Sequence, residues 1–132
     1  KPNISEFETL CNTRINNKNE VVKHVREIID NGVTNVLVSL GDEGSVVVNS
    51  GSAYFVEALP VHVKGTVGAG DSMVAGLAHG LETNMALEDT LRLATACSTA
   101  CVHAGSTEGI EKKLIYKYLD NIEIEKMTNP IT

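Results

Sequence analysis

The stretch Gly65-Thr66-Val67-Gly68-Ala69-Gly70-Asp71 is the most informative part of this 132-residue sequence. An apolar stripe at helical spacing follows it from Met73 to Leu81, which predicts a helix over residues 71 to 80 or 82. Glycine allows a ligand to come close to the backbone, and the free amide groups at a helix N-terminus attract an anion. The sequence therefore predicts a phosphate cradle formed by the glycines and the first helical turn.

Asp71 is unexpected in such a cradle, because its carboxylate repels a phosphate that only has to bind. A general base would explain it, since the carboxylate could accept a proton from an attacking hydroxyl while the cradle stabilises the transferring phosphoryl group. An ordinary acidic residue in a first helical turn also explains it, and the spacing alone leaves both interpretations open. The stretch is not a Walker A loop, since no Gly-Lys-Ser/Thr follows, and Met73 replaces the third glycine of a dinucleotide fingerprint.

Composition limits the classes to which the chain can belong. With 42% hydrophobic and 21% charged residues, we expect one globular domain over residues 1–132. The net charge of -6 argues against a nucleic-acid partner. No apolar run reaches the roughly 18 to 20 residues of a membrane span. Three cysteines without a signal-peptide pattern predict a cytoplasmic protein with no disulfide framework.

Hydrophobic periodicity and turn residues predict a mixture of helices and strands. Asn3 and Glu6 have the spacing of a capping box for the first helix. Turns at residues 41–44 and 49–51 predict a β-meander in the middle of the chain. The expected helices cover residues 4–11, 20–31, 71–80 or 82, 86–104 and 111–120. The expected strands cover 36–40, 45–48 and 53–56, followed by an extended piece at 61–64 and a short strand or tail at 122–124.

Three motifs, spread in order over residues 1 to 110, resemble one known family. They are Lys1-Pro2-Asn3 with Glu6, Val38-Ser39-Leu40-Gly41 with Gly44, and the segment from Thr66 to Gly76. Together they resemble the ribokinase-like (pfkB) carbohydrate kinases, and especially their 1-phosphofructokinase branch. The resemblance implies an α/β three-layer ribokinase-like fold, of which this chain carries the C-terminal half of the sheet with its flanking helices.

The resemblance also implies a reaction, ATP-dependent phosphoryl transfer to a sugar phosphate. The first choice is fructose 1-phosphate giving fructose 1,6-bisphosphate, with Mg²⁺ bridging the nucleotide phosphates. Asp71 would be the general base, and the backbone amides of Gly68, Ala69 and Gly70 would form the anion hole. The family's N-terminal sugar-binding half and lid are missing from these residues, so we expect the chain alone to be inactive. A tagatose-6-phosphate kinase, a nucleotide-binding module without turnover and a homo-oligomeric state remain open.

Further site residues follow from the resemblance, and each has a structural alternative. Asn3 and Glu6 help to arrange the metal ion and phosphates in the family, or they form a plain capping box. The residues that match the nucleotide-binding region are Ser39, Gly41, Gly44, Thr66, Ser98, His103 and Gly105. Gly41 and Gly44 also suit a hairpin turn, and the two roles are compatible. A zinc site at Cys97, Cys101 and His103 is not expected, because a fourth ligand is lacking.

Overall fold

The computed structural model describes residues 1–128, in which the chain forms two compact units. The first, which we call the sheet unit, comprises Lys1–Glu57 and the chain from Ile124 onward. The second, the helical unit, comprises Ala58–Glu123. The chain thus leaves the sheet unit after Glu57 and returns to it after the helical unit. The prediction of one domain over residues 1–132 stays a prediction.

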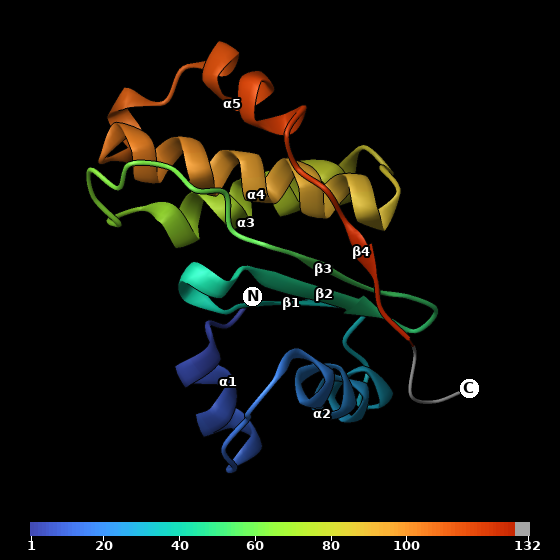
Figure 1. The fold of residues 1–132 in the computed structure, drawn as a ribbon. Coiled ribbons are helices and arrows are strands. Elements are labelled where there is room, and N and C mark those ends of the chain that lie inside the picture. Colours follow the sequence, from blue (N-terminus) through green and yellow to red (C-terminus); the bar gives the residue numbers. More distant parts are fainter. Residues whose placement is uncertain (129–132) are drawn as a thin grey trace. The chain divides into compact units, whose positions relative to one another are not determined.

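An antiparallel sheet organises the sheet unit, with its strands in the order β1-β2-β3-β4 (Figure 1). The strands are β1 (Asn35–Ser39), β2 (Ser45–Asn49), β3 (Ala53–Val56) and β4 (Glu125–Lys126). Gly44 lies in the first turn with φ 118°, where a Cβ atom would lie 1.9 Å from the Val56 carbonyl oxygen. In the second turn Asn49 Oδ1 accepts the N–H groups of Gly51 and Ser52 at 3.0 and 2.9 Å. The β-meander predicted from these turn residues is confirmed.

Two helices, α1 (Ile4–Cys11) and α2 (Lys18–Asp30), pack on this sheet. Phe7 of α1 and Val21 and Val25 of α2 are buried, because they share the sheet-facing sides of their helices. They pack with Val36, Val38, Val46, Val48, Ala53, Phe55 and Met127. Burying each large apolar side chain contributes about 1.5 to 3 kcal/mol, so this core stabilises the sheet unit.

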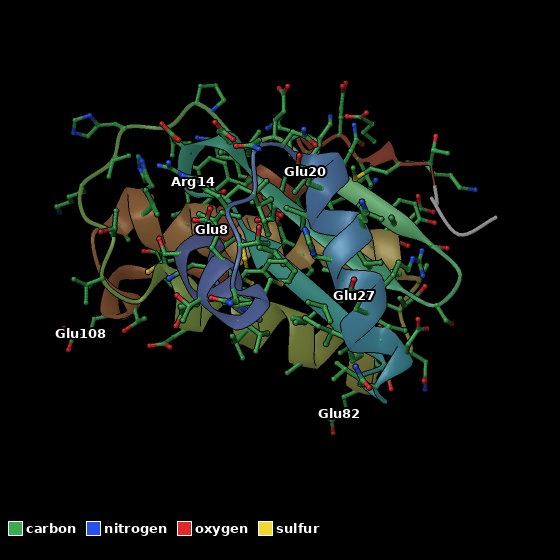
Figure 2. The ribbon with its side chains drawn as sticks, turned by 90° about the horizontal axis from the view of Figure 1, so that it is seen from below. Glu8, Arg14, Glu20, Glu27, Glu82 and Glu108 are labelled. Atoms are coloured by element: carbon green, nitrogen blue, oxygen red, sulfur yellow. The ribbon has the colours of Figure 1, made fainter. Side chains whose placement is uncertain are left out.

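Glutamate side chains hold the link between α1 and α2 (Figure 2). Glu8 Oε2 accepts the Ile15 N–H at 2.9 Å, and Glu20 Oε2 accepts the Asn16 N–H at 2.8 Å. Asn17 Oδ1 accepts the Glu20 N–H at 3.0 Å and so caps α2. This cap explains why α2 begins two residues before the predicted start.

The helical unit contains α3 (Ala69–Glu82), α4 (Leu87–Ala104) and α5 (Lys112–Leu119) (Figure 1). α3 and α4 lie side by side, and α5 packs against α4. A Cβ atom on Gly76 would lie only 2.7 Å from Ala94 Cα, so the two helices approach each other closely at this point. The small residues on α4 allow this approach, as the sequence predicts.

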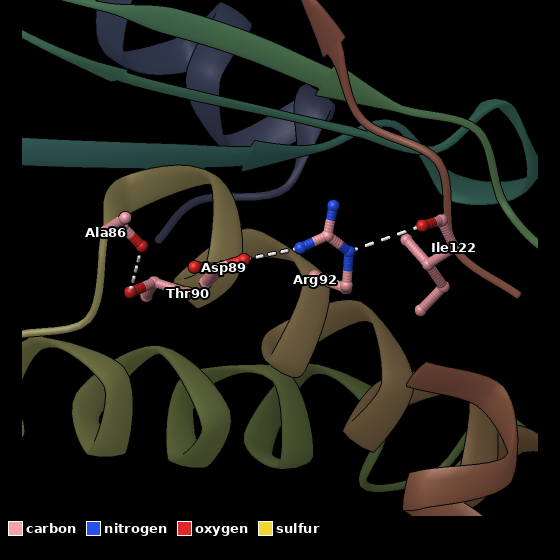
Figure 3. Close-up of polar contacts among 5 residues, drawn as sticks. All are labelled: Ala86, Asp89, Thr90, Arg92 and Ile122. Atoms are coloured by element: carbon pink, nitrogen blue, oxygen red, sulfur yellow. Dashed lines mark hydrogen bonds and ion pairs between the residues drawn. The ribbon is translucent and has the colours of Figure 1, made fainter. Parts of the chain in front are cut away.

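Arg92 of α4 also holds the segment that follows α5 (Figure 3). Its Nε atom donates to the Ile122 carbonyl oxygen at 3.3 Å, and its Nη1 atom pairs with Asp89. Ile122 is buried, and its carbonyl group is bonded to a side chain rather than to a strand. Residues 122–124 therefore form no strand, so of the expected strand or tail the tail is correct there, and the last strand is β4, further along the chain.

The other predicted helices and strands are confirmed, with ends that differ by at most two residues. The segment 61–64 joins no strand; its last residue, Lys64, donates its N–H to the Val102 carbonyl oxygen at 3.0 Å. Within residues 1–128, no helix is both long enough and apolar enough to cross a membrane.

Candidate functional site

The N-terminus of α3 presents free backbone donors. Gly68 is the N-cap residue, with φ 88°, and it has no side chain that could bond the first amide groups. The Ala69 N–H donates to the Thr66 carbonyl oxygen at 3.2 Å. Among residues 1–128, the N–H groups of Gly68, Gly70 and Asp71 find no acceptor. The helix dipole adds about half a positive charge, so this helix end suits an anion.

The last turn of α4 and the short 3-10 helix Thr107–Gly109 hold the cradle loop in place. Cys101 is fully buried, and its thiol donates to the Val67 carbonyl oxygen at 3.5 Å. A Cβ atom on Gly68 would lie 2.7 Å from Thr107 Cγ2 and 3.5 Å from Cys101 Sγ. A side chain at residue 68 would therefore collide with Thr107, and the positive φ disfavours it further. The sequence reasoning missed both contacts, because they depend on tertiary packing.

Asp71 is the third residue of α3, and its side chain is exposed. Within the described part of the chain, its carboxylate forms no hydrogen bond and no ion pair. A helix-capping role would require a bond to the Gly68 N–H, and this bond is not present. The carboxylate oxygens are therefore available to accept a proton from a ligand.

Asn3 and Glu6 close the N-terminus of α1. Asn3 Oδ1 accepts the Glu6 N–H at 2.9 Å, and Glu6 Oε1 accepts the Asn3 N–H at 3.0 Å. The capping-box interpretation is confirmed. Both side chains are exposed, and the second carboxylate oxygen of Glu6 remains available to another partner.

The sheet unit brings two of the three sequence motifs together. Asn3 forms a parallel bridge with Ser39, and the Ser39 N–H donates to the Pro2 carbonyl oxygen at 3.1 Å. Gly41 and Gly44 follow in the turn after β1 with φ values of 64° and 118°. The hairpin-turn interpretation of these two glycines is confirmed, and the turn follows the strand end that Asn3 contacts.

The third motif and the other predicted residues lie in the helical unit. Thr66 is exposed in the cradle loop, and Ser98 is half-buried on α4. Gly105 ends α4 with φ 87°. The exposed His103 ring meets Tyr118 edge-on, with the ring centroids 6.2 Å apart. The predicted site residues thus form two groups, one in each unit.

The acidic residues suit a magnesium ion that is carried by a nucleotide. Among residues 1–128, no three His, Cys, Asp or Glu side chains gather as a metal site. Mg²⁺ in kinases is held through substrate phosphates and only one or two carboxylates. Glu6 and Asp71 are exposed and each keeps a free carboxylate oxygen. Each of these carboxylates, taken by itself, is therefore compatible with a magnesium–nucleotide complex.

Comparison with known protein families shows that the three sequence motifs lie within a single family match. The profile of the pfkB family carbohydrate kinases matches residues 1–113. The chain belongs to the pfkB family. Both its sheet-unit motifs and its α3 cradle fall within the matched residues.

Two curated relatives of this pfkB chain are 1-phosphofructokinases. The protein from Borreliella burgdorferi is 30% identical over 126 residues, which cover 95% of this chain and 40% of that relative. The protein from Escherichia coli K12 is 38% identical over 102 residues, which cover 77% of this chain and 33% of that relative. The chain thus spans about a third to two fifths of the length of these relatives.

Solved structures of two further relatives share the fold of this pfkB chain. Phosphofructokinase-2 from Escherichia coli, in complex with substrates and products, matches with a TM-score of 0.84 and 33% identity, over 91% of this chain and 39% of that one. Arabidopsis thaliana ribokinase, complexed with ribose and ATP, matches with a TM-score of 0.80 and 29% identity, over 89% of this chain and 39% of that one. The predicted ribokinase-like α/β fold is confirmed.

Proposed function

We propose that this chain supplies the phosphoryl-transfer site of an ATP-dependent sugar-phosphate kinase. One observation carries the proposal: α3 begins with free backbone amides, and the exposed Asp71 carboxylate beside them has no intramolecular partner. A site that only binds phosphate gains nothing from this charge, whereas a kinase needs a base beside its anion hole. Membership of the pfkB family and the similarity to 1-phosphofructokinases support the proposal.

Asp71 is the general base of the proposed reaction. Its carboxylate accepts the proton of the attacking sugar hydroxyl, the hydroxyl oxygen bonds to the γ-phosphorus of ATP, and the bond from that phosphorus to the ADP oxygen breaks. The amides of Gly68, Ala69 and Gly70 form the anion hole for the transferring group. The Gly68 and Gly70 amides contribute most, because the Ala69 N–H is shared with the Thr66 carbonyl oxygen.

The nucleotide and its magnesium ion are assigned to the residues that match the family motifs. Asn3 and Glu6 organise the ion and the phosphates, and the free oxygen of Glu6 is the atom available for this. Bound Mg²⁺ neutralises part of the phosphate charge. The nucleotide contacts are assigned to Ser39, Gly41, Gly44, Thr66, Ser98, His103 and Gly105.

Fructose 1-phosphate is the proposed sugar substrate, with fructose 1,6-bisphosphate as the product. The curated 1-phosphofructokinases support this choice. Fructose 6-phosphate is the second candidate, because a relative named ATP-dependent 6-phosphofructokinase isozyme 2, from Escherichia coli K12, is 38% identical over 101 residues. Self-association is also proposed, since a tetrameric inhibited form of Escherichia coli phosphofructokinase-2 matches at a TM-score of 0.77 and 35% identity. A cytoplasmic location stays a prediction.

Release of ADP is the measurement that tests the proposal. Because we expect the chain alone to be inactive, the assay uses a longer kinase that contains it, with fructose 1-phosphate, fructose 6-phosphate and tagatose 6-phosphate as substrates. We expect kcat/KM for fructose 1-phosphate to exceed the other two values by at least about tenfold. ATP binding without turnover of any of the three sugars would support a nucleotide-binding module instead.

A further inference from the structure

Cys101, in the last turn of α4, is bonded to the loop that precedes α3. Its side chain is fully buried, and its thiol donates to the Val67 carbonyl oxygen at 3.5 Å. The Val67 side chain is 80% exposed, so side-chain packing does not hold this residue in place. Among residues 1–128, no backbone N–H donates to the Val67 carbonyl oxygen. The orientation of this carbonyl group therefore depends on the thiol.

The same bond determines the direction of a neighbouring amide. The Val67 carbonyl group and the Gly68 N–H belong to one planar, trans peptide unit, so the two groups point in opposite directions. The thiol holds the carbonyl oxygen toward the buried Cys101 side chain. The Gly68 N–H consequently points away from Cys101, and it finds no acceptor among residues 1–128. This N–H is one of the donors assigned above to the anion hole.

The Gly68 N–H depends on this bond because neither α3 nor its own residue fixes its direction. Gly68 is the N-cap, which lies outside the regular helical backbone. Glycine adopts φ values of either sign at little cost, so the Val67–Gly68 peptide unit can rotate at its Gly68 end. The preceding peptide unit is held separately, since the Thr66 carbonyl oxygen accepts the Ala69 N–H at 3.2 Å. The unit that carries the Gly68 N–H is therefore the one that Cys101 controls.

We propose that Cys101 is a positioning residue for phosphoryl transfer. Its thiol selects the orientation of the Val67–Gly68 peptide unit in which the Gly68 N–H faces the transferring phosphoryl group. In this role Cys101 touches neither the nucleotide nor the sugar and acts through a backbone group. The inference rests on the proposed function, because it uses the assignment of the Gly68 N–H to the anion hole.

Replacing Cys101 by alanine should lower kcat less than the complete loss of an anion-hole donor, which costs about 10² to 10³-fold. A thiol is a weak hydrogen-bond donor, so without it part of the population keeps the productive orientation. In a longer kinase that contains this chain, Cys101→Ala should lower kcat with fructose 1-phosphate about threefold to tenfold. The KM for ATP should stay within about twofold, because the amide acts mainly on charge that develops in the transition state.

Serine at the same position separates hydrogen bonding from packing. Cys101→Ser keeps a donor on the same Cβ atom and should hold kcat within about twofold of the unmodified kinase. If Cys101 only fills space, alanine should be tolerated better than serine, because a buried hydroxyl group without a partner is destabilising. A kcat for Cys101→Ala that equals or exceeds that of Cys101→Ser would overturn the inference.

Cys97→Ala is the matched control. Cys97 lies one turn earlier on the same helix and is half-buried. It packs toward α3 and not toward the loop, since a Cβ atom on Gly76 would lie 3.2 Å from Cys97 Sγ. The control removes the same chemical group from α4 without touching the Val67 carbonyl group, and kcat should stay within about twofold of the unmodified kinase.

Amide NMR of the labelled chain tests the orientation without any measurement of activity. Residues 67 and 68 are the one place in the 132 residues where glycine directly follows valine. Labelling valine carbonyl carbons with ¹³C and glycine nitrogens with ¹⁵N therefore gives a single carbonyl–amide cross-peak, from this peptide unit. Cys101→Ala should shift or split the cross-peak, and Cys97→Ala should leave it unchanged. Unchanged signals from glycines distant from both cysteines show that the variants fold.

The two measurements distinguish a failure of this inference from a failure of the proposed function. An unchanged cross-peak in Cys101→Ala, or an equal change in Cys97→Ala, would overturn the inference. An unchanged kcat in Cys101→Ala would also overturn it if Asp71→Asn lowers kcat in the same kinase. An unchanged kcat in Asp71→Asn would contradict the proposed function instead, and the cross-peak would still show whether the thiol orients the peptide unit.

Discussion

The N-termini of α1 and α3 carry an acidic residue at the same position, three residues after the N-cap. Side chains cap the N-terminus of α1 but not that of α3. At α1 the side chains of Asn3 and Glu6 bond each other's backbone N–H groups, at 2.9 and 3.0 Å. At α3 the N-cap is Gly68, and the Asp71 side chain forms no hydrogen bond or ion pair within the described residues. One helix end is closed by its own side chains, and the other is open to a ligand.

The identity of the N-cap residue accounts for the difference. An N-cap Asn supplies a side-chain oxygen to the first turn, which stabilises the helix without any ligand. An N-cap Gly with φ 88° supplies none, so the amide donors and the nearby carboxylate stay available. The difference between the two helices is therefore that α1 bonds its own first-turn amides, whereas α3 leaves amide donors and a carboxylate available side by side.

The largest effect is expected when the carboxylates of Asp71 and Glu6 are neutralised, because the two changes should alter kcat to very different extents. In a longer kinase that contains this chain, Asp71→Asn should lower kcat about 10² to 10⁴-fold, the usual range for a lost general base. Glu6→Gln should keep the cap, because glutamine also forms a capping box, and should change kcat less than about tenfold. Steady-state kinetics with fructose 1-phosphate measure both.

Glu82→Gln is the matched control for Asp71→Asn, because Glu82 is an exposed carboxylate on the same helix (Figure 2). It should leave kcat unchanged. A fall in kcat of less than threefold in Asp71→Asn would contradict the assignment of Asp71 as the general base. It would also contradict the proposed role of the α3 N-terminus in phosphoryl transfer.

A side chain at the open N-cap should damage the helical unit. Gly68→Ala should lower the free energy of unfolding by about 1 to 3 kcal/mol, because alanine is strained at this φ and its Cβ would lie 2.7 Å from Thr107 Cγ2. Gly51→Ala, whose Cβ would meet only Asn49 Oδ1 at an ordinary contact distance of 3.9 Å, should cost less than about 0.5 kcal/mol. Urea unfolding measures both variants.

A double-mutant cycle tests whether contact with Thr107 contributes to the destabilisation expected for Gly68→Ala. Thr107→Ser removes the methyl group that the new Cβ would meet, so it should recover part of the loss in the Gly68→Ala background. Strictly additive losses would show that the positive φ alone, and not the packing of Thr107, requires glycine at position 68.

Removing the cap of the closed end should have a moderate effect on stability. Asn3→Ala deletes the oxygen that accepts the Glu6 N–H and should lower the free energy of unfolding by about 1 kcal/mol. Asn17→Ala, which deletes the equivalent bond at α2, is the matched comparison and should cost a similar amount. If Asn3→Ala leaves stability unchanged while Asn17→Ala lowers it, the first cap does not stabilise α1.

The smallest expected effect concerns cysteine labelling. Burial and the nearby charge of Glu27 raise the pKa of the Cys11 thiol, so its reaction with iodoacetamide should require a higher pH than that of an unburied cysteine. ATP should slow the labelling of Cys101, whose thiol bonds to the Val67 carbonyl oxygen in the cradle loop, and leave Cys11 at the end of α1 unaffected. Mass spectrometry of labelled peptides separates the two rates, and equal protection by ATP would contradict a ligand at the open end.

The closed helix end and the β-meander could be predicted from the sequence, because their determinants are local. Asn3 and Glu6 are three residues apart, and each turn residue lies between the strands it connects. The start of α3 was harder to predict, since the N-cap, Gly68 with its positive φ, lies three residues before the expected first residue. The helix propensities of the residues do not predict the φ angle of Gly68.

The contacts that hold the loop before α3 in place could not be predicted, because they join segments that are far apart in the chain. Cys101 and Thr107 contact the cradle loop from the end of α4 and the residues after it. The last strand, for which the sequence suggested a strand or tail at 122–124, was missed at its true position for the same reason. Its position depends on pairing with β3, in which Tyr54 is opposite Lys126, and not on the apolar residues near position 122.

That pairing of β4 with β3 also constrains the order of folding. The whole helical unit, Ala58–Glu123, lies in the chain between these two neighbouring strands. Closing a flexible loop of about 70 residues costs roughly 4 kcal/mol of chain entropy. If α3 and α4 fold first, the chain between the two strands is less flexible, and the entropy cost of closing it falls. We therefore expect β4 to dock last, with the Lys18–Glu125 ion pair at 2.8 Å and the burial of Met127 completing the sheet.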